Sequence, residues 1–123
     1  FPGQGSQLPG MIKSVKELPR VREMLAKANE ILGWDLMEWS EKADLIRINN
    51  LVESMPAMFV AGCAAAEKLR KDVGDDQVDR AAGMAGLSVG EYCALHIAGV
   101  FTFEDGLRIV AERAKATFAA AKL

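Results

Sequence analysis

Ser88 lies at the centre of the sequence GLSVG, residues 86–90, and this spacing could present a nucleophile. A Cβ at either glycine would collide with the neighbouring strand or helix where the chain reverses, so the turn needs glycine at both positions. The serine hydroxyl would then project outward. The amide of Val89 would lie at the start of the next helix, where unpaired N–H groups and the helix dipole stabilise a developing oxyanion. The sequence of this one turn therefore predicts a nucleophile and part of an oxyanion hole.

A turn of this kind needs a strand before it and a helix after it. Residues 81–86 form an uncharged run of strand length, and residues 92–98 are compatible with a helix. The sequence around Ser88 therefore predicts the required context. The alternative is a glycine-rich strand-to-helix turn with an idle serine, and other parts of the chain must decide between the two.

A serine nucleophile also needs a base within hydrogen-bond reach, and the chain contains one histidine, His96. His96 follows Ser88 on the same predicted helix at a distance of about 12 Å along the axis, given a rise of about 1.5 Å per residue. We therefore expect it to pack or to be solvated. Cys93 and His96, with Cys63 as the only further soft ligand, do not complete a metal site, so we expect no metal.

Composition limits the classes of protein to which the chain can belong. Its 123 residues, half of them hydrophobic, suffice for one core, and we expect one domain. The formal charge is −2 and the 15 basic residues are scattered, so we expect no nucleic acid partner. Uncharged runs such as 54–66 are too short to cross a bilayer, so we expect no membrane span. We expect Cys63 and Cys93 to be buried free thiols.

Apolar periodicity predicts most of the secondary structure. We expect an amphipathic helix over 19–32 that ends at Gly33, a short helix over 41–48, a buried helix over 56–71 and a final helix from 103 to the end. Two further expectations are that Thr102 caps the last helix and that the tryptophans at 34 and 39 pack.

The N-terminal segment 1–7 is a glycine-rich loop that would suit the end of a strand. It lacks the third glycine of a dinucleotide fingerprint and the lysine of a phosphate loop, and a plain turn is the alternative. The order of elements predicts an α/β fold with a parallel sheet. Since two strands make no stable sheet, we expect the chain to be the front portion of a larger domain. The chain starts with Phe1, so we expect a cut N-terminus, and any targeting peptide would lie upstream.

Four segments, taken together, resemble the malonyl-CoA:acyl carrier protein transacylase family. They are Phe1-Pro2-Gly3-Gln4-Gly5-Ser6-Gln7, Pro56-Ala57, Gly86-Leu87-Ser88-Val89-Gly90-Glu91-Tyr92, and Phe103-Glu104-Asp105-Gly106-Leu107 leading to Arg113. The resemblance covers essentially the whole chain, which would be a partial acyltransferase domain over 1–123. It implies an α/β-hydrolase-like large subdomain, of which the front is present, while the ferredoxin-like small subdomain and the C-terminal part are missing.

The resemblance also implies a role for each site residue. Ser88 would be the acylated nucleophile, and the backbone amides of Gln4 and Val89 would form the oxyanion hole. Arg113 would hold the malonyl carboxylate, because a guanidinium offers two parallel N–H bonds to a carboxylate. Malonyl would pass from malonyl-CoA to Ser88 and then to the phosphopantetheine thiol of acyl carrier protein, with no cofactor. The histidine base would lie outside this chain, so we expect the isolated 123-residue chain to be nearly inactive.

Three positions depart from the common family pattern. Leu87 replaces a frequent histidine and resembles plastid-type sequences, so we expect a plastid location, with the cytoplasm or mitochondrion as alternatives. Met55 replaces a glutamine that lines the pocket, and Ala114 replaces a glycine after Arg113. The functional alternatives are an acyltransferase domain of a multifunctional fatty acid or polyketide synthase, a non-catalytic fragment that binds a carrier protein, and a general serine hydrolase.

Overall fold

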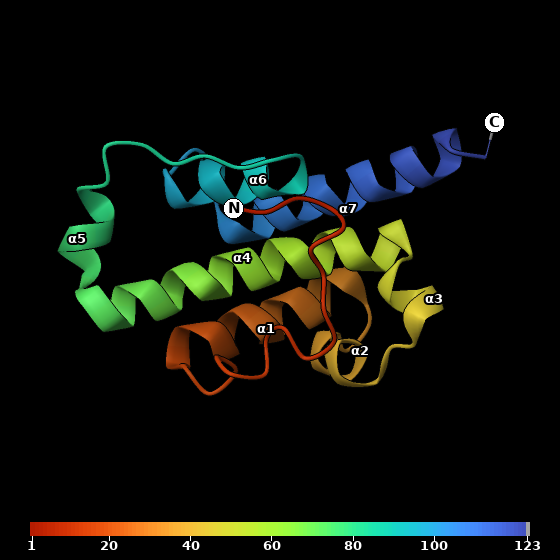
Figure 1. Ribbon diagram of the computed structural model, residues 1–123, viewed down its shortest axis with the longest axis horizontal. Helices are drawn as coiled ribbons and strands as arrows, with labels where there is room; N and C mark the ends of the chain where they lie inside the picture. The colour runs from red at the N-terminus through yellow and green to blue at the C-terminus, as the bar shows by residue number, and fades with distance from the viewer. Residues whose placement is uncertain (123) are drawn as a thin grey trace.

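The computed structural model describes residues 1–122 and contains seven helices in that range (Figure 1). In chain order they are α1 Pro19–Leu32, α2 Leu36–Lys42, α3 Leu45–Ile48, α4 Leu51–Val73, α5 Asp75–Asp79, α6 Val89–Ile97 and α7 Phe103–Ala120. The described residues are helical, and the parallel sheet of the predicted α/β fold is not among them.

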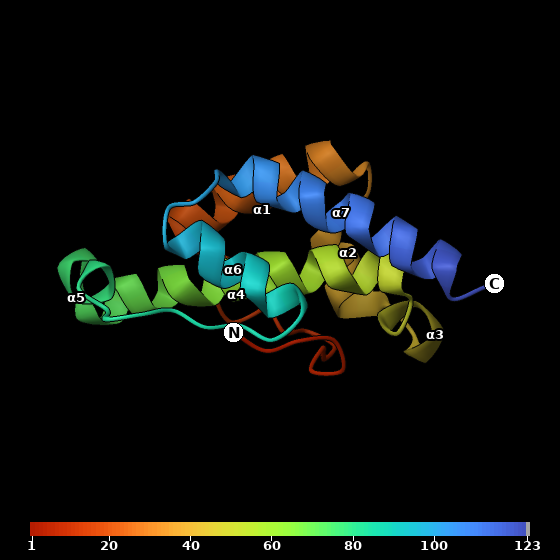
Figure 2. The ribbon, with the colours of Figure 1, turned by 90° about the horizontal axis from the view of Figure 1, so that it is seen from above.

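Helix α4 is the central element, and it contacts α1, α3, α5, α6 and α7. Seen from above, α1 and α7 lie on one side of α4 and the N-terminal segment lies on the other (Figure 2). The α4 side chains of Phe59, Val60 and Cys63 are fully buried, as are Leu107 and Val110 on α7. Burial of this much apolar surface around one helix stabilises the arrangement that places α6 beside α7.

The predicted helices at 19–32 and from 103 are confirmed, and their ends follow the expected capping chemistry. Pro19 occupies the first turn of α1, and Gly33 ends the helix with a φ of 77°, a left-handed conformation that favours glycine. The Thr102 hydroxyl accepts a 3.1 Å hydrogen bond from the amide of Asp105 at the start of α7.

The prediction that the buried helix begins at Pro56 is wrong, because α4 begins at Leu51 and continues to Val73. The side chain of Asn50 accepts a 3.0 Å hydrogen bond from the amide of Val52 and caps the helix there. Pro56 therefore lies inside the helix, where it removes one backbone donor. The burial of Met55, Ala57 and Met58 in the core around Pro56 offsets that loss.

The short helix predicted over 41–48 is also wrong, because the chain forms two helices that meet at Asp44. The carboxylate of Asp35 caps α2 by accepting from the Glu38 amide, and that of Asp44 caps α3. The predicted packing role of the tryptophans is confirmed. Trp39 is fully buried, and its ring centroid lies 6.1 Å from that of Trp34.

The strand predicted over 81–86 is not present, and no strand occurs within residues 1–122. The segment instead runs alongside the N-terminus. The backbone nitrogen of Phe1 donates to the carbonyl of Ala85 at 2.7 Å, and the Leu87 amide donates to the Phe1 carbonyl at 3.0 Å. These two bonds have the pattern of a parallel pairing. A strand needs a longer ladder than one residue can provide, and for this reason the described segment stays irregular.

The cysteine prediction is confirmed, since Cys63 and Cys93 are both free thiols and both buried. Burial raises the pKa of the Cys63 thiol, because the charged thiolate is poorly solvated in the core. Both side chains are enclosed by the core, so neither thiol is available as a surface nucleophile. Among the described residues, no helix combines the length and the hydropathy that a bilayer crossing requires.

Candidate functional site

The turn at Ser88 has a strained backbone that projects its side chain. Ser88 has φ 54° and ψ −117°, and it is the only non-glycine residue with a positive φ in the part of the chain that the structure describes. The turn is closed by a 2.9 Å hydrogen bond from the Gly90 amide to the Leu87 carbonyl. Helix α6 begins at Val89, so the Ser88 side chain, which is exposed, stands at the helix N-terminus. Strain held in this way is typical of functional turns.

The two glycines of the motif are required by close backbone approaches. A Cβ on Gly86 would lie 2.0 Å from the carbonyl oxygen of Gly90, on the first turn of α6. A Cβ on Gly90 would lie 2.3 Å from the carbonyl oxygen of Phe1. These are backbone atoms, which cannot move aside as a flexible side chain can. The sequence-based explanation for both glycines is therefore confirmed.

We expect Gly86→Ala to destabilise the protein, because the added methyl group must push the turn away from α6. The free energy of unfolding of the full-length protein should fall by about 1–3 kcal/mol, the usual cost of overpacking. Denaturant titration measures this change. Gly83→Ala is the matched control, since a Cβ there meets nothing within 4 Å. Equal stability of the two variants would contradict the close approach at Gly86.

The N-terminal loop lies directly against this turn although 84 residues separate them in sequence. A Cβ on Gly3 would lie 2.7 Å from the carbonyl oxygen of Leu87 and 3.4 Å from the Cβ of Ser88. Gly3 is buried and Gln4 is half-buried. The backbone of the N-terminal loop therefore lies next to the nucleophile. Val89, the residue directly after Ser88 in sequence, lies on the other side of it along the chain.

Arg113 reaches Ser88 from α7. Its Nη2 donates to the Ser88 Oγ at 3.4 Å, and its Cζ lies 5.4 Å from the centre of the Tyr92 ring. Its Nη1 is buried and has no hydrogen-bond partner in residues 1–122. Tyr92 is one turn after Ser88 on α6, so the ring supports the guanidinium through a cation–π contact. An anionic group beside Ser88 would therefore find a pre-positioned cation whose Nη2 already lies at the site.

His96 is used for packing, as the sequence predicts. Its Nδ1 lies 3.0 Å from the Phe101 carbonyl oxygen, and its ring contacts those of Phe59 and Phe103 at centroid distances of 6.2 and 6.0 Å. The described chain therefore supplies Ser88 with no histidine base. It also contains no cluster of three or more metal-ligating side chains between residues 1 and 122.

Two residues that contact this site were missed in the sequence. Ser54, at the start of α4, is fully buried and its Oγ accepts a 2.8 Å hydrogen bond from the Gln4 Nε2. Tyr92 belongs to the segment 86–92, and its position one helical turn after Ser88 could have indicated a neighbour of the site. For Ser54 the sequence offers no signal, because its partner is distant in the chain. Met55 beside it is 3% exposed and belongs to the core.

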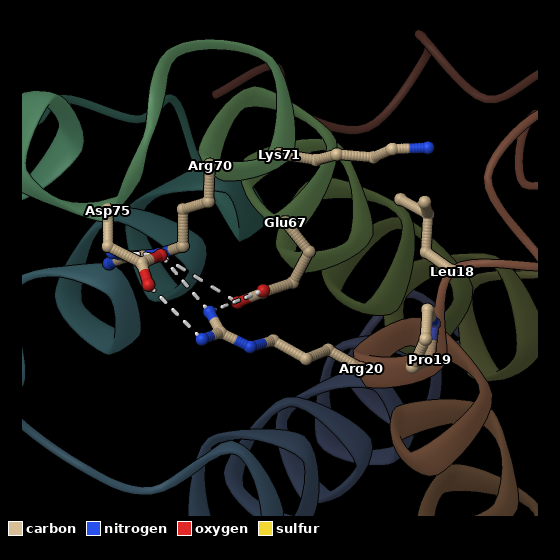
Figure 3. Close-up of a pocket in the computed structure, with 7 residues that line it drawn as sticks. All are labelled: Leu18, Pro19, Arg20, Glu67, Arg70, Lys71 and Asp75. Atoms are coloured by element: carbon tan, nitrogen blue, oxygen red, sulfur yellow. Dashed lines mark hydrogen bonds and ion pairs between the residues drawn. The ribbon is translucent and has the colours of Figure 1, made fainter.

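A hollow of about 290 Å³ lies between α1, α4 and α5 and involves none of the predicted site residues (Figure 3). Its lining residues are Leu18, Pro19, Arg20, Glu67, Arg70, Lys71 and Asp75. Arg20 lies 3.1 Å from Glu67 and 3.2 Å from Asp75. The hydrogen bond from Arg20 holds the pKa of the Asp75 carboxyl below its usual value. The opposite charges in these ion pairs neutralise one another, and the pairs connect α1, α4 and α5. The charged residues that line the hollow therefore have a structural role.

Comparison with known proteins agrees with this geometry. The family described as "Acyl transferase domain" matches residues 1–122. The chain is 43% identical, over 116 residues, to the mitochondrial malonyl-CoA-acyl carrier protein transacylase of Homo sapiens. The match covers 94% of this chain and 30% of the human protein.

Two solved structures show the same helical arrangement. The malonyl-CoA:ACP transacylase of Synechocystis superposes with a TM-score of 0.88 at 34% identity, over 98% of this chain and 39% of that one. A malonyl transacylase in complex with its type II polyketide synthase acyl carrier protein superposes with a TM-score of 0.81 at 34% identity, over 94% of this chain and 36% of that one. The chain therefore spans well under half the length of the proteins it resembles.

Proposed function

This chain belongs to the acyl transferase domain family, and on that premise we propose that it carries the nucleophile of a malonyl-CoA:acyl carrier protein transacylase. The observation that carries the proposal is the 3.4 Å approach of the Arg113 Nη2 to the Ser88 Oγ. A hydrolase of neutral esters has no need for a guanidinium at its nucleophile. A substrate whose acyl group ends in a carboxylate does need a cation there.

In the proposed reaction Ser88 attacks the thioester carbonyl of malonyl-CoA. The Oγ–carbon bond forms, the carbon–sulfur bond breaks, and coenzyme A leaves as the thiol after it takes up the serine proton through a base. The phosphopantetheine thiol of acyl carrier protein then attacks the malonyl-serine ester and restores the Ser88 hydroxyl. Both steps pass through a tetrahedral intermediate with one negatively charged oxygen.

The backbone amides of Gln4 and Val89 are the proposed oxyanion donors. Val89 supports this role because its amide lies at the N-terminus of α6, where the helix dipole favours negative charge. Gln4 supports it because its loop is within contact distance of Leu87 and Ser88. Two donors from opposite sides of the nucleophile would hold the oxyanion without rearrangement during the reaction.

The larger architecture is part of the same proposal. We place residues 1–123 in an acyltransferase domain whose large subdomain is α/β-hydrolase-like with a parallel sheet, beside a ferredoxin-like small subdomain. The parallel pairing of Phe1 with residues 85–87 supports the sheet. A crystal structure of the full-length protein in which these segments join no sheet would contradict it.

A plastid location is the remaining proposal, and it is supported by Leu87 in the position before the nucleophile. The relative from Homo sapiens is named as mitochondrial. Imaging of the full-length protein with a C-terminal fluorescent tag separates the two locations. Mitochondrial fluorescence would contradict the plastid proposal.

The activity is tested with the full-length protein, labelled malonyl-CoA and holo acyl carrier protein. We expect the label to move to the carrier protein, since a thiol acceptor competes with water for the acyl-serine. Gel separation of the labelled carrier protein measures the transfer. Release of free malonate without carrier labelling would instead support the hydrolase alternative.

A further inference from the structure

The loop that carries Gln4 has little intrinsic rigidity. Gln4 is flanked by glycines on both sides, and Gly5 has a φ of +104°, a conformation that other residues rarely adopt. A backbone amide between two glycines can rotate at small cost in energy. The Ser6 amide donates a 3.3 Å hydrogen bond to the Gly3 carbonyl across the turn, and the contacts that Gln4 makes elsewhere add to this restraint on its amide.

One side-chain hydrogen bond provides that contact. The Gln4 Nε2 donates to the Oγ of Ser54 at 2.8 Å, across 50 residues of sequence. The Gln4 Oε1 is buried and has no partner in residues 1–122, so this is the only hydrogen bond recorded for the side chain. Ser54 is itself fully buried on the first turns of α4 and cannot move with the loop. The bond thus connects a flexible loop to the most extensively packed helix of the fold.

A second connection holds the far end of the loop. Gln7 accepts a 2.7 Å hydrogen bond from the Gly5 amide and donates to the Asn49 Oδ1 at 3.2 Å, just before α4. Gln4 is thus held by Ser54, while the turn after it is held by Gln7. Of these two connections, the bond to Ser54 is the one made by the proposed oxyanion residue itself.

We propose that Ser54 is a positioning residue, which aligns the Gln4 backbone amide with the oxyanion through the hydrogen bond between their side chains. This inference rests on the proposed acyl transfer at Ser88. Ser54 does not touch the substrate. Without the Ser54 hydroxyl, the half-buried Gln4 side chain would lose its hydrogen bond and would turn toward solvent. The amide would then be displaced from the charge that develops in the transition state.

The test compares Ser54→Ala and Ser54→Thr in the full-length protein. We expect Ser54→Ala to lower kcat for malonyl transfer about tenfold, with KM for malonyl-CoA within about twofold of the parent, because only transition-state stabilisation is lost. Ser54→Thr keeps the hydroxyl and should restore kcat to within about threefold. Steady-state kinetics and thermal melting are measured on the same preparations.

Ser40→Ala is the matched control, because the Ser40 Oγ is equally buried but has no hydrogen-bond partner in the described chain. We expect it to leave kcat unchanged. A double-mutant cycle gives the decisive result. In a Gln4→Leu background, Ser54→Ala should have no further effect on kcat, since the bond is already absent.

Three outcomes would overturn the role of Ser54: an unchanged kcat in Ser54→Ala, an equal loss in Ser40→Ala, or an additive loss in the Gln4→Leu background. Failure of the proposed function looks different, because the parent protein itself would then transfer no malonyl group. Should Ser54→Ala not fold, failure of Ser54→Thr to retain kcat while it melts like the parent would also contradict the inference.

Discussion

Ser88→Ala in the full-length protein is expected to lower malonyl transfer by about ten-thousandfold or more and to abolish the covalent malonyl adduct. Removing the Oγ removes the atom that accepts the acyl group, and no neighbouring group can replace it. Cys63 and Cys93 are buried, and burial raises the pKa of Cys63. Intact mass measurement after exposure to malonyl-CoA detects the adduct, and carrier protein labelling measures the rate.

Ser14→Ala is the control for this variant, since Ser14 is also an exposed serine but lies outside the site. It should retain both the adduct and the rate. The backbone strain at Ser88 is independent of the hydroxyl, so thermal melting of Ser88→Ala should stay close to that of the parent. Persistence of the adduct in Ser88→Ala would refute the assignment of the nucleophile.

Arg113→Ala is expected to lower kcat/KM for malonyl-CoA by about a hundredfold. A charged hydrogen-bonding pair of this kind contributes about 3 kcal/mol, and about 1.4 kcal/mol corresponds to a tenfold change. Acetyl-CoA has no carboxylate for the guanidinium to bind, so its slow transfer should not fall. The ratio of malonyl to acetyl transfer by each variant is the quantity to measure.

Two further variants make this prediction specific. Arg113→Lys keeps the charge but loses the paired N–H geometry and the contact with Tyr92, so it should recover only part of the selectivity. Arg108→Ala removes an exposed arginine from the same helix, where it pairs with Asp105, and should leave selectivity unchanged. An unaltered malonyl-to-acetyl ratio in Arg113→Ala would show that the guanidinium does not bind the substrate.

Most of the helices could be predicted from the sequence because their signals are local. The periodicity of α1, with Pro19 and Gly33 at its ends, and the capping of α7 by Thr102 depend on residues a few positions apart. The two misplaced helix boundaries have a common cause. Asn50 caps α4 and Asp44 caps α3, but the proline and the apolar residues nearby are competing signals for a helix start. The sequence alone does not show which of these signals prevails. The strand over 81–86 is absent from the described residues, and its formation depends on pairing with distant segments rather than on local sequence.

The features of the site likewise divide into those that local sequence determines and those that depend on tertiary contacts. The spacing of Gly86, Ser88 and Gly90 determined by itself that the chain turns sharply at a serine that heads a helix, since this needs only local backbone geometry. Only the tertiary structure decided that Arg113 contacts Ser88 and that Ser54 holds Gln4. Those contacts join residues on α7, α4 and the N-terminal loop, and they exist because burial around α4 brings these elements to one turn.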